Sequence, residues 1–138
     1  MKFKFLEDVA IADIAFEAYG KTLNEVFENS AYAFFDMTCN PKTIKSKIKK
    51  TINLKDKDEK NLLYNFLSEL VFLKDSKQLI FSKVKVVIKD NKLKATLYGD
   101  KIDYEKQELR NDIKAVTFHQ FNLEKTKSGY KTRVVVDI

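Results

Sequence analysis

Hydrophobic and polar residues alternate at the start of the chain. The alternation covers residues 2–5 and returns over residues 14–18. A period of two is typical of a strand with one buried face. We therefore expect two short strands, separated by a break around residues 7–12 and by a bend that contains Asp13.

Two later segments have apolar residues three and four positions apart, which is the spacing of one helix face. The first covers residues 22–36 and begins at Thr22, with Glu25 three positions later. This pair is a capping-box signature. The second covers residues 58–73 and is rich in leucine. Both segments are predicted to be amphipathic helices.

The other segments alternate again and are predicted to be strands. Asp90-Asn91 fits a tight hairpin turn. Tyr98-Gly99-Asp100 is expected to end the strand after that turn, and residues 103–116 predict a polar loop with one helical turn near 110–114. The predicted strands are residues 43–54, 79–89, 93–97, 116–123 and 130–138, the last two joined by a turn at Lys127-Ser128-Gly129.

These elements predict an α+β fold, with a largely antiparallel sheet and two main helices packed on it. A length of 138 residues suits a single domain over residues 1–138. Hydrophobic residues make up 44% of the sequence. A chain of this size and composition can fill a core without disulfides or a structural metal.

Cysteine content and hydropathy indicate the compartment. Cys39 is the only cysteine, so an intramolecular disulfide is impossible, which fits a reducing environment. No apolar run is long enough for a signal peptide or a membrane span. We expect a soluble, cytoplasmic protein that does not contact a membrane.

The charge balance is basic, with 26 Lys and Arg against 20 Asp and Glu and a net charge of +6. Such a balance favours attraction to RNA or to an acidic protein. A direct RNA-binding module would use Lys45, Lys47, Lys49 and Lys50. The alternative is an ordinary lysine-rich surface, which we favour because both signs are interspersed.

The residues that enzymes commonly use are sparse. The three glycines are far apart, so a phosphate-binding glycine loop is excluded. With one cysteine and one histidine the chain cannot form a Cys/His zinc site. A Cys39–His119 nucleophilic pair is formally possible, but an ordinary cysteine after a helix is the simpler interpretation. Alternation places His119 opposite Phe118, as a partly buried structural histidine or at a partner-binding surface.

Carboxylates near the end of the chain offer different chemistry. Asp137 precedes Ile138, so its side chain and the terminal carboxylate lie within a few ångströms. Together with a third carboxylate they would suit Ca²⁺ or Mg²⁺, which prefer oxygen ligands. Asp13 also lies between apolar neighbours, but spacing alone does not identify it as that third group, and both aspartates also fit an exposed strand face.

Several segments in this order resemble the archease family, and the resemblance extends over nearly the whole chain. One departure is that many members carry His-Thr before Ala-Asp, where this chain has Ala10-Ile11. The segments that carry the resemblance are residues 5–7, 12–14, 18–23 with 25 and 27–29, 33–38, 61–70, 98–100 with 103, 113–119 and 136–138.

The resemblance implies an accessory function and not an enzymatic one. Archeases assist the RtcB-type ligase that joins RNA ends during tRNA splicing. They promote guanylylation of its active-site histidine, which gives multiple turnover and broadens the nucleotides accepted. The family's divalent-metal site, generally calcium, corresponds here to Asp13, Asp137 and Ile138.

The resemblance leaves an alternative, a chaperone-like module for an RNA-modifying enzyme such as a tRNA methyltransferase. In either case we expect RNA contact to be indirect or weak. Five further polar residues are candidates for the partner surface, although a role in the fold is favoured for each. They are Lys21, Asp36, Asp103, Lys114 and His119.

Overall fold

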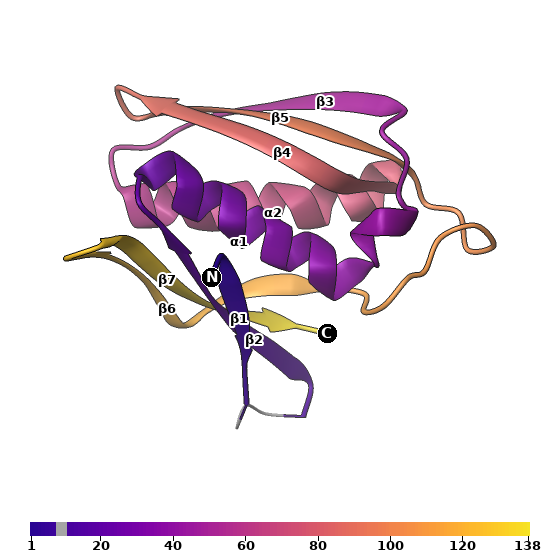
Figure 1. Ribbon diagram of the computed structural model, residues 1–138, viewed down its shortest axis with the longest axis horizontal. Coiled ribbons are helices and arrows are strands. Elements are labelled where there is room, and N and C mark those ends of the chain that lie inside the picture. Colours follow the sequence, from indigo (N-terminus) through magenta and orange to yellow (C-terminus); the bar gives the residue numbers. More distant parts are fainter. Residues whose placement is uncertain (8–10) are drawn as a thin grey trace.

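Two antiparallel sheets enclose two helices in this computed structural model, which describes residues 1–7 and 11–138 (Figure 1). The helices α1 and α2 form the middle layer between the sheets. The elements are β1 (Phe3–Leu6), β2 (Asp13–Gly20), α1 (Leu23–Thr38), a 3₁₀ turn η1 (Pro41–Thr43), β3 (Ile48–Lys55), α2 (Glu59–Lys77), β4 (Leu79–Lys89), β5 (Lys92–Lys101), β6 (Ala115–Thr126) and β7 (Gly129–Asp137).

The strands are divided by their position in the sequence. One sheet has the order β1-β2-β7-β6 and joins both ends of the chain, while the other has the order β3-β5-β4. All strand pairs are antiparallel. The predicted α+β class with antiparallel pairing is therefore confirmed, and the strands form two sheets with the helices between them.

Local side-chain hydrogen bonds define where the helices begin. Thr22 is the N-cap of α1, and its hydroxyl accepts a hydrogen bond from the N–H of Glu25 at 3.2 Å. The Glu25 carboxylate accepts in return from the N–H of Lys21 at 2.9 Å. Asp58 caps α2 by accepting from two backbone N–H groups of the first turn. These contacts satisfy donors that lack a partner within a helix.

A continuous core lies between the two sheets. It includes Phe16 from β2, Phe27 and Phe35 from α1, Phe66 from α2 and Leu97 from β5, all with at most 1% of their surface exposed. Burying one such side chain contributes about 1.5–3 kcal/mol. The apolar faces that alternation and helical spacing predicted are the faces that meet in this core.

Several predicted boundaries are corrected. Asp13 is the first residue of β2 and does not lie in a bend. Both helices extend beyond their predicted ends, and residues 43–47 precede β3 instead of forming part of it. The Tyr98-Gly99-Asp100 segment does not end β5, which continues to Lys101. Gly99 lets the strand pass close to β4, because a Cβ there would overlap the carbonyl of Ile80.

The connection between β5 and β6 was also predicted incorrectly in part. Residues 110–114 contain no helical turn and follow an extended path, as do residues 108–109, where Leu109 forms a bridge with Cys39. The turn in this connection lies earlier, at residues 104–106, and is closed by the N–H of Gln107 donating to the carbonyl of Asp103 at 3.2 Å. The hairpin at Asp90-Asn91 is confirmed, with both φ angles positive at 53° and 65°, as the tight hairpin turn requires.

In the described part of the chain, the helices are too short or too polar to cross a membrane.

Candidate functional site

Asp13 and Asp137 are brought together by the pairing of β2 with β7. They are direct cross-strand partners at one end of the ladder. Directly opposed residues of an antiparallel pair have their side chains on the same face of the sheet, with Cβ atoms about 4.5–5.5 Å apart. The fold therefore places two carboxylates, 124 positions apart in the chain, side by side.

Alternation along the strands shows which face this is. The next pair in the register is Ile14 with Val136, and Val136 is fully buried in the core between the sheets. The two aspartates therefore lie on the opposite, outer face, where both are partly exposed. Among the residues that the structure describes, neither carboxylate accepts a side-chain hydrogen bond or forms an ion pair.

Backbone hydrogen bonds hold the end of the chain beside this pair. The N–H of Ile138 donates to the carbonyl of Ala12 at 2.9 Å, and the N–H of Lys114 donates to the carbonyl of Asp137 at 2.7 Å. Asp137 is thus fixed from both neighbouring strands. Ile138, the third residue expected at this site, follows directly, and its backbone is held beside Ala12, next to Asp13.

The donor set fits a hard divalent cation. Two carboxylates opposed across a ladder repel each other, and a cation bound between them would remove that cost. Calcium takes oxygen ligands only. In the described ranges no group of three His, Cys, Asp or Glu side chains gathers. The pair of aspartates therefore needs a further oxygen donor to complete a metal site, and Ile138 is the residue held beside the pair.

Two of the other candidate residues have structural contacts of their own. Asp36, near the end of α1, forms an ion pair with Arg110 at 3.2 Å. Asp103 accepts hydrogen bonds from the N–H groups of Glu105 and Lys106, which closes a turn after β5. Both carboxylates therefore stabilise the connection between β5 and β6, which lies on the same side of the molecule as the C-terminus (Figure 1).

The remaining candidates lie in three different places. Lys114 is exposed and adjoins Asp137 through its backbone. Lys21 follows Gly20 at the opposite end of β2 from Asp13, about 26 Å away at the rise of a strand. His119 is exposed on β6 and is not partly buried. The five residues therefore do not form one continuous surface, and Lys114 is the one that adjoins the carboxylate pair.

The nucleophilic pair that the sequence allowed is not formed. Cys39 is fully buried, with its thiol donating to the carbonyl of Phe35 at 3.3 Å. Burial raises the pKa of the thiol to about 11, so it stays protonated at neutral pH. His119 is exposed on another element. Cys39 is therefore an ordinary core residue, as the simpler interpretation stated.

Two buried charged groups were not anticipated. Glu17 lies in the middle of β2 and contacts Lys4, Lys131 and the hydroxyl of Tyr19 at 3.4, 3.2 and 3.0 Å. Lys74, only 8% exposed, contacts Asp75 and Asp112, each at 2.5 Å. The burial of Lys74 could have been predicted from helical spacing, because Lys74 follows Leu70 by one turn on the buried face of α2.

These features define a class of protein: a small α+β fold of two antiparallel sheets around two helices, with an acidic corner where the last strand ends. The chain belongs to the family described as "Archease protein family (MTH1598/TM1083)", which it matches over residues 3–138.

The chain is similar in sequence to known archeases over most of their length and of its own. The chain is 40% identical to protein archease of Pyrococcus furiosus over 132 residues, covering 92% of this chain and 93% of the other. It is 37% identical to protein archease of Methanosarcina barkeri, covering 99% and 96%. The expected family resemblance is therefore confirmed.

Solved structures share the fold. The solution structure of Methanobacterium thermoautotrophicum protein 1598 has a TM-score of 0.81 and 36% identity, covering 99% of this chain and 98% of that one. A crystal structure from Thermotoga maritima, described as an archease and possible chaperone, has a TM-score of 0.68 and covers 94% and 93%. At 22% identity that second likeness concerns the fold alone.

Proposed function

We propose that this chain is a metal-binding accessory protein of an RtcB-type RNA ligase that acts in tRNA splicing. It promotes guanylylation of the ligase's active-site histidine, and so allows many turnovers and a broader range of nucleoside triphosphates. It works in the cytoplasm and does not itself catalyse ligation. Its membership of the archease family supports this proposal.

One observation carries the proposal to particular residues. Asp13 and Asp137 are cross-strand partners, and the backbone N–H of Ile138 is hydrogen-bonded to Ala12, the residue before Asp13. In the proposal these three residues hold a divalent cation, most suitably Ca²⁺, through carboxylate oxygens. When bound, the cation supplies a compact positive charge that attracts phosphate oxygens and water.

The chain's own contribution is the position and charge of this corner. Pairing with both β2 and β6 fixes the backbone of Asp137, so its carboxylate requires little ordering when a partner binds. The corner lies on an outer sheet face that no described helix covers (Figure 1). The proposal is that this corner reaches the nucleotide site of the ligase and favours return to the guanylylated form.

The test is a ligation assay with limiting RtcB-type ligase from the same source, excess RNA with processed ends, GTP and Mn²⁺. Addition of this protein should convert a single turnover into many. Asp13→Asn and Asp137→Asn should each lose most of this stimulation. Glu124→Gln is a control, because it removes the same single negative charge from an exposed residue of β6 away from the acidic corner.

The assay has two outcomes that contradict the proposal. Unchanged turnover with folded wild-type protein would exclude the accessory role for this ligase. Normal stimulation by both aspartate variants would retain that role but exclude the carboxylate corner from it. Thermal denaturation of each variant shows whether loss of activity reflects loss of the fold.

A second candidate function is a chaperone-like module for an RNA-modifying enzyme such as a tRNA methyltransferase. It is favoured by one observation, the description of the Thermotoga maritima protein as a possible chaperone. This function predicts less aggregation of the partner enzyme on heating, measured by light scattering. It also predicts that guanosine nucleotide has no effect, which distinguishes it from the ligase role.

A further inference from the structure

The outer face of the β3-β5-β4 sheet is strongly basic. Where all three strands are paired, twelve side chains lie on this face, and the register fixes which they are. Asp100 of β5 lies on the same face just beyond this stretch, opposite Ile80. None of the twelve is Asp or Glu, and all of the lysines among them are exposed. The seven lysines are Lys49, Lys55, Lys83, Lys85, Lys89, Lys92 and Lys94.

The lysines are crowded and have no acidic partners. Lys92 of β5 has Lys55 of β3 on one side and Lys89 of β4 on the other, so three ammonium groups form one row across the sheet. Like charges directly opposite each other destabilise a sheet. Among the residues that the structure describes, none of the seven forms an ion pair. A bound polyanion would remove this repulsion.

This face also has features suited to the bases of a nucleic acid. Tyr98 of β5 is half-buried and lies between Lys49 and Lys83 in the register. A shallow hollow lies nearer the hairpin, lined by Asn53, Val87 and Asp90 together with neighbouring lysines. A basic surface with an aromatic ring is the usual platform for single strands, because phosphates meet cations while a base stacks.

We propose that the outer face of the β3-β5-β4 sheet binds the sugar–phosphate backbone of a single-stranded polynucleotide. The lysines contact phosphates, and Tyr98 stacks on a base. This site differs from the lysine cluster at residues 45–50 that the sequence suggested. Lys50 lies on the inner face of β3, and Lys45 and Lys47 precede the strand. Most of the lysines on this face belong instead to β4 and β5, which are distant from that cluster in the sequence.

A lipid surface fits this face less well. Interfacial membrane binding requires a set of apolar side chains on the contacting face. Val87, 49% exposed, is the large apolar residue that stands out on this face. Lysine charge without an apolar set instead suits a flexible, hydrated polyanion.

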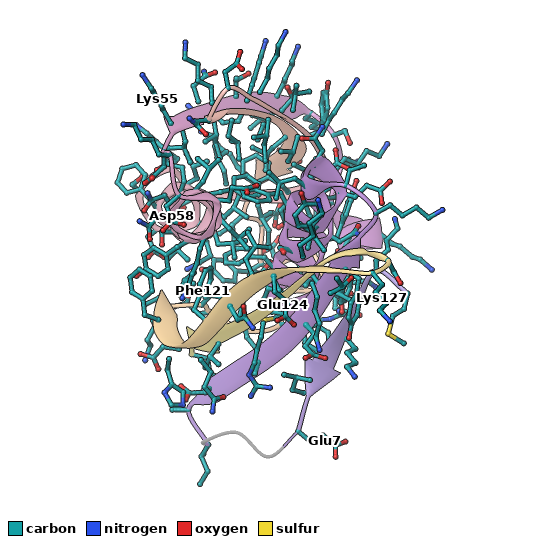
Figure 2. The ribbon with its side chains drawn as sticks, turned by 90° about the vertical axis from the view of Figure 1, so that its left-hand side faces the viewer. Glu7, Lys55, Asp58, Phe121, Glu124 and Lys127 are labelled. Atoms are coloured by element: carbon teal, nitrogen blue, oxygen red, sulfur yellow. The ribbon has the colours of Figure 1, made fainter. Side chains whose placement is uncertain are left out.

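The position of the face makes it independent of the acidic corner. The two sheets turn their outer faces in opposite directions, with both helices between them (Figure 1). In Figure 2 nitrogen-tipped side chains project from the upper sheet, near the labelled Lys55, while Glu124 and Lys127 belong to the lower one. A test of polynucleotide binding therefore needs no ligase, and its failure would not affect the proposed accessory function.

The experiment measures fluorescence anisotropy of a labelled 20-nucleotide oligouridylate with the full chain, between about 50 and 200 mM salt. Binding should be weak and should fall steeply as salt rises. The face variant combines Lys85→Thr, Lys89→Thr and Lys94→Thr. It should lose at least about tenfold in affinity at low salt, and the slope of log K against log salt should fall by about two, at about 0.7 for each phosphate that a lysine no longer neutralises.

The matched control removes three exposed lysines from elsewhere, as Lys106→Thr, Lys125→Thr and Lys127→Thr. Its net charge equals that of the face variant, and its affinity should change by less than about threefold. Equal losses in both variants would overturn the proposal, because binding would then depend on net charge alone. Melting temperatures establish that both variants are folded.

Further binding measurements distinguish a single-stranded polynucleotide from other negatively charged ligands. Tyr98→Val should weaken oligouridylate binding about fivefold and leave binding of inorganic polyphosphate, which has no bases, unchanged. Single-stranded DNA should bind in the same way as RNA, since the backbone is recognised. Face-dependent binding to phosphatidylserine vesicles or to polyglutamate, without binding of oligonucleotide, would overturn the proposal in favour of a membrane or an acidic protein.

Discussion

Phe118 stacks on Tyr64, with ring centroids 3.9 Å apart and planes within 12° of parallel, although the Phe118 side chain is 58% exposed. The contact joins β6 to α2, and the Tyr64 hydroxyl donates to the carbonyl of Val116 at 3.0 Å. An irregularity in the β6–β7 register between Thr117 and Asn122 makes this arrangement possible. It places Phe121 on the same face of β6 as Phe118, where both rings pack against Tyr64, and Phe121 is buried while Phe118 stays exposed.

The two phenylalanines should therefore differ in their effect on stability. Phe121→Ala opens a cavity in the core and should lower the free energy of unfolding by about 3–5 kcal/mol. Phe118→Ala removes one exposed ring and its stacking on Tyr64, and should cost about 0.5–1.5 kcal/mol. Urea denaturation followed by circular dichroism measures both. Equal losses in the free energy of unfolding would contradict the assignment of Phe118 to the surface and of Phe121 to the core.

This irregularity also explains why the sequence did not predict the surroundings of His119. Strict alternation places His119 and Phe118 on opposite faces, one of them buried. The structure exposes both, because Gln120 adopts a positive φ of 54° and interrupts the alternation. A glutamine in the left-handed region has no sequence signal, since glycine and asparagine are the residues that favour it.

Features that depend on neighbouring residues were predictable. The Thr22 cap, the Asp90-Asn91 turn and the extent of β4 follow from patterns a few residues long. The division into two sheets depends on the pairing of β2 with β7, between opposite ends of the chain, and no local pattern encodes it. For the same reason, spacing could not place Asp13 beside Asp137. That association came from the family resemblance, and the register brings the two residues together.

Glu17 provides a test based on pH. Burial alone would raise the pKa of Glu17, but hydrogen bonds from Tyr19, Lys131 and Lys4 hold the pKa below its ordinary value. A lowered pKa in the folded state stabilises the protein above the unfolded pKa, and this contribution is lost as pH falls through the folded pKa. Glu17→Gln should therefore cost about 1–3 kcal/mol at pH 7.

The difference between wild type and Glu17→Gln should begin to shrink only as pH falls below about 4.3, the ordinary pKa of glutamate, because the wild-type carboxyl then becomes protonated. Thermal unfolding at each pH measures the change. Glu124→Gln is the control, since Glu124 is exposed on β6 of the same sheet, and its effect should be small throughout. A difference for Glu17→Gln that persists undiminished at low pH would show that charge is not the cause.

Lys74 tests whether a buried ion pair stabilises this fold. Burial alone would lower the pKa of Lys74, but hydrogen bonds to Asp112 and Asp75 hold the pKa above its ordinary value. Both aspartates are largely exposed, with 76% and 57% of their side chains accessible, so they remain hydrated without the lysine. Lys74→Met keeps the packing of the aliphatic stem and should change the free energy of unfolding by less than about 1 kcal/mol.

Lys74→Ala removes the stem as well and should cost about 2 kcal/mol or more, by loss of packing. Chemical denaturation of the two variants gives the comparison. If the methionine variant were as unstable as the alanine variant, the ion pair itself and not the packing of the stem would be the stabilising element.

The carboxyl group of Ile138 offers a test of the proposed metal corner that leaves every side chain in place. Extending the chain by a C-terminal tag converts this carboxylate into an amide, which removes one charged ligand, whereas the same tag before Met1 does not. Calcium affinity measured by calorimetry should therefore fall about tenfold or more with the C-terminal tag only. Because the N–H of Ile138 binds Ala12, the strand end should stay ordered in both proteins. Equal affinities would exclude this carboxylate as a ligand.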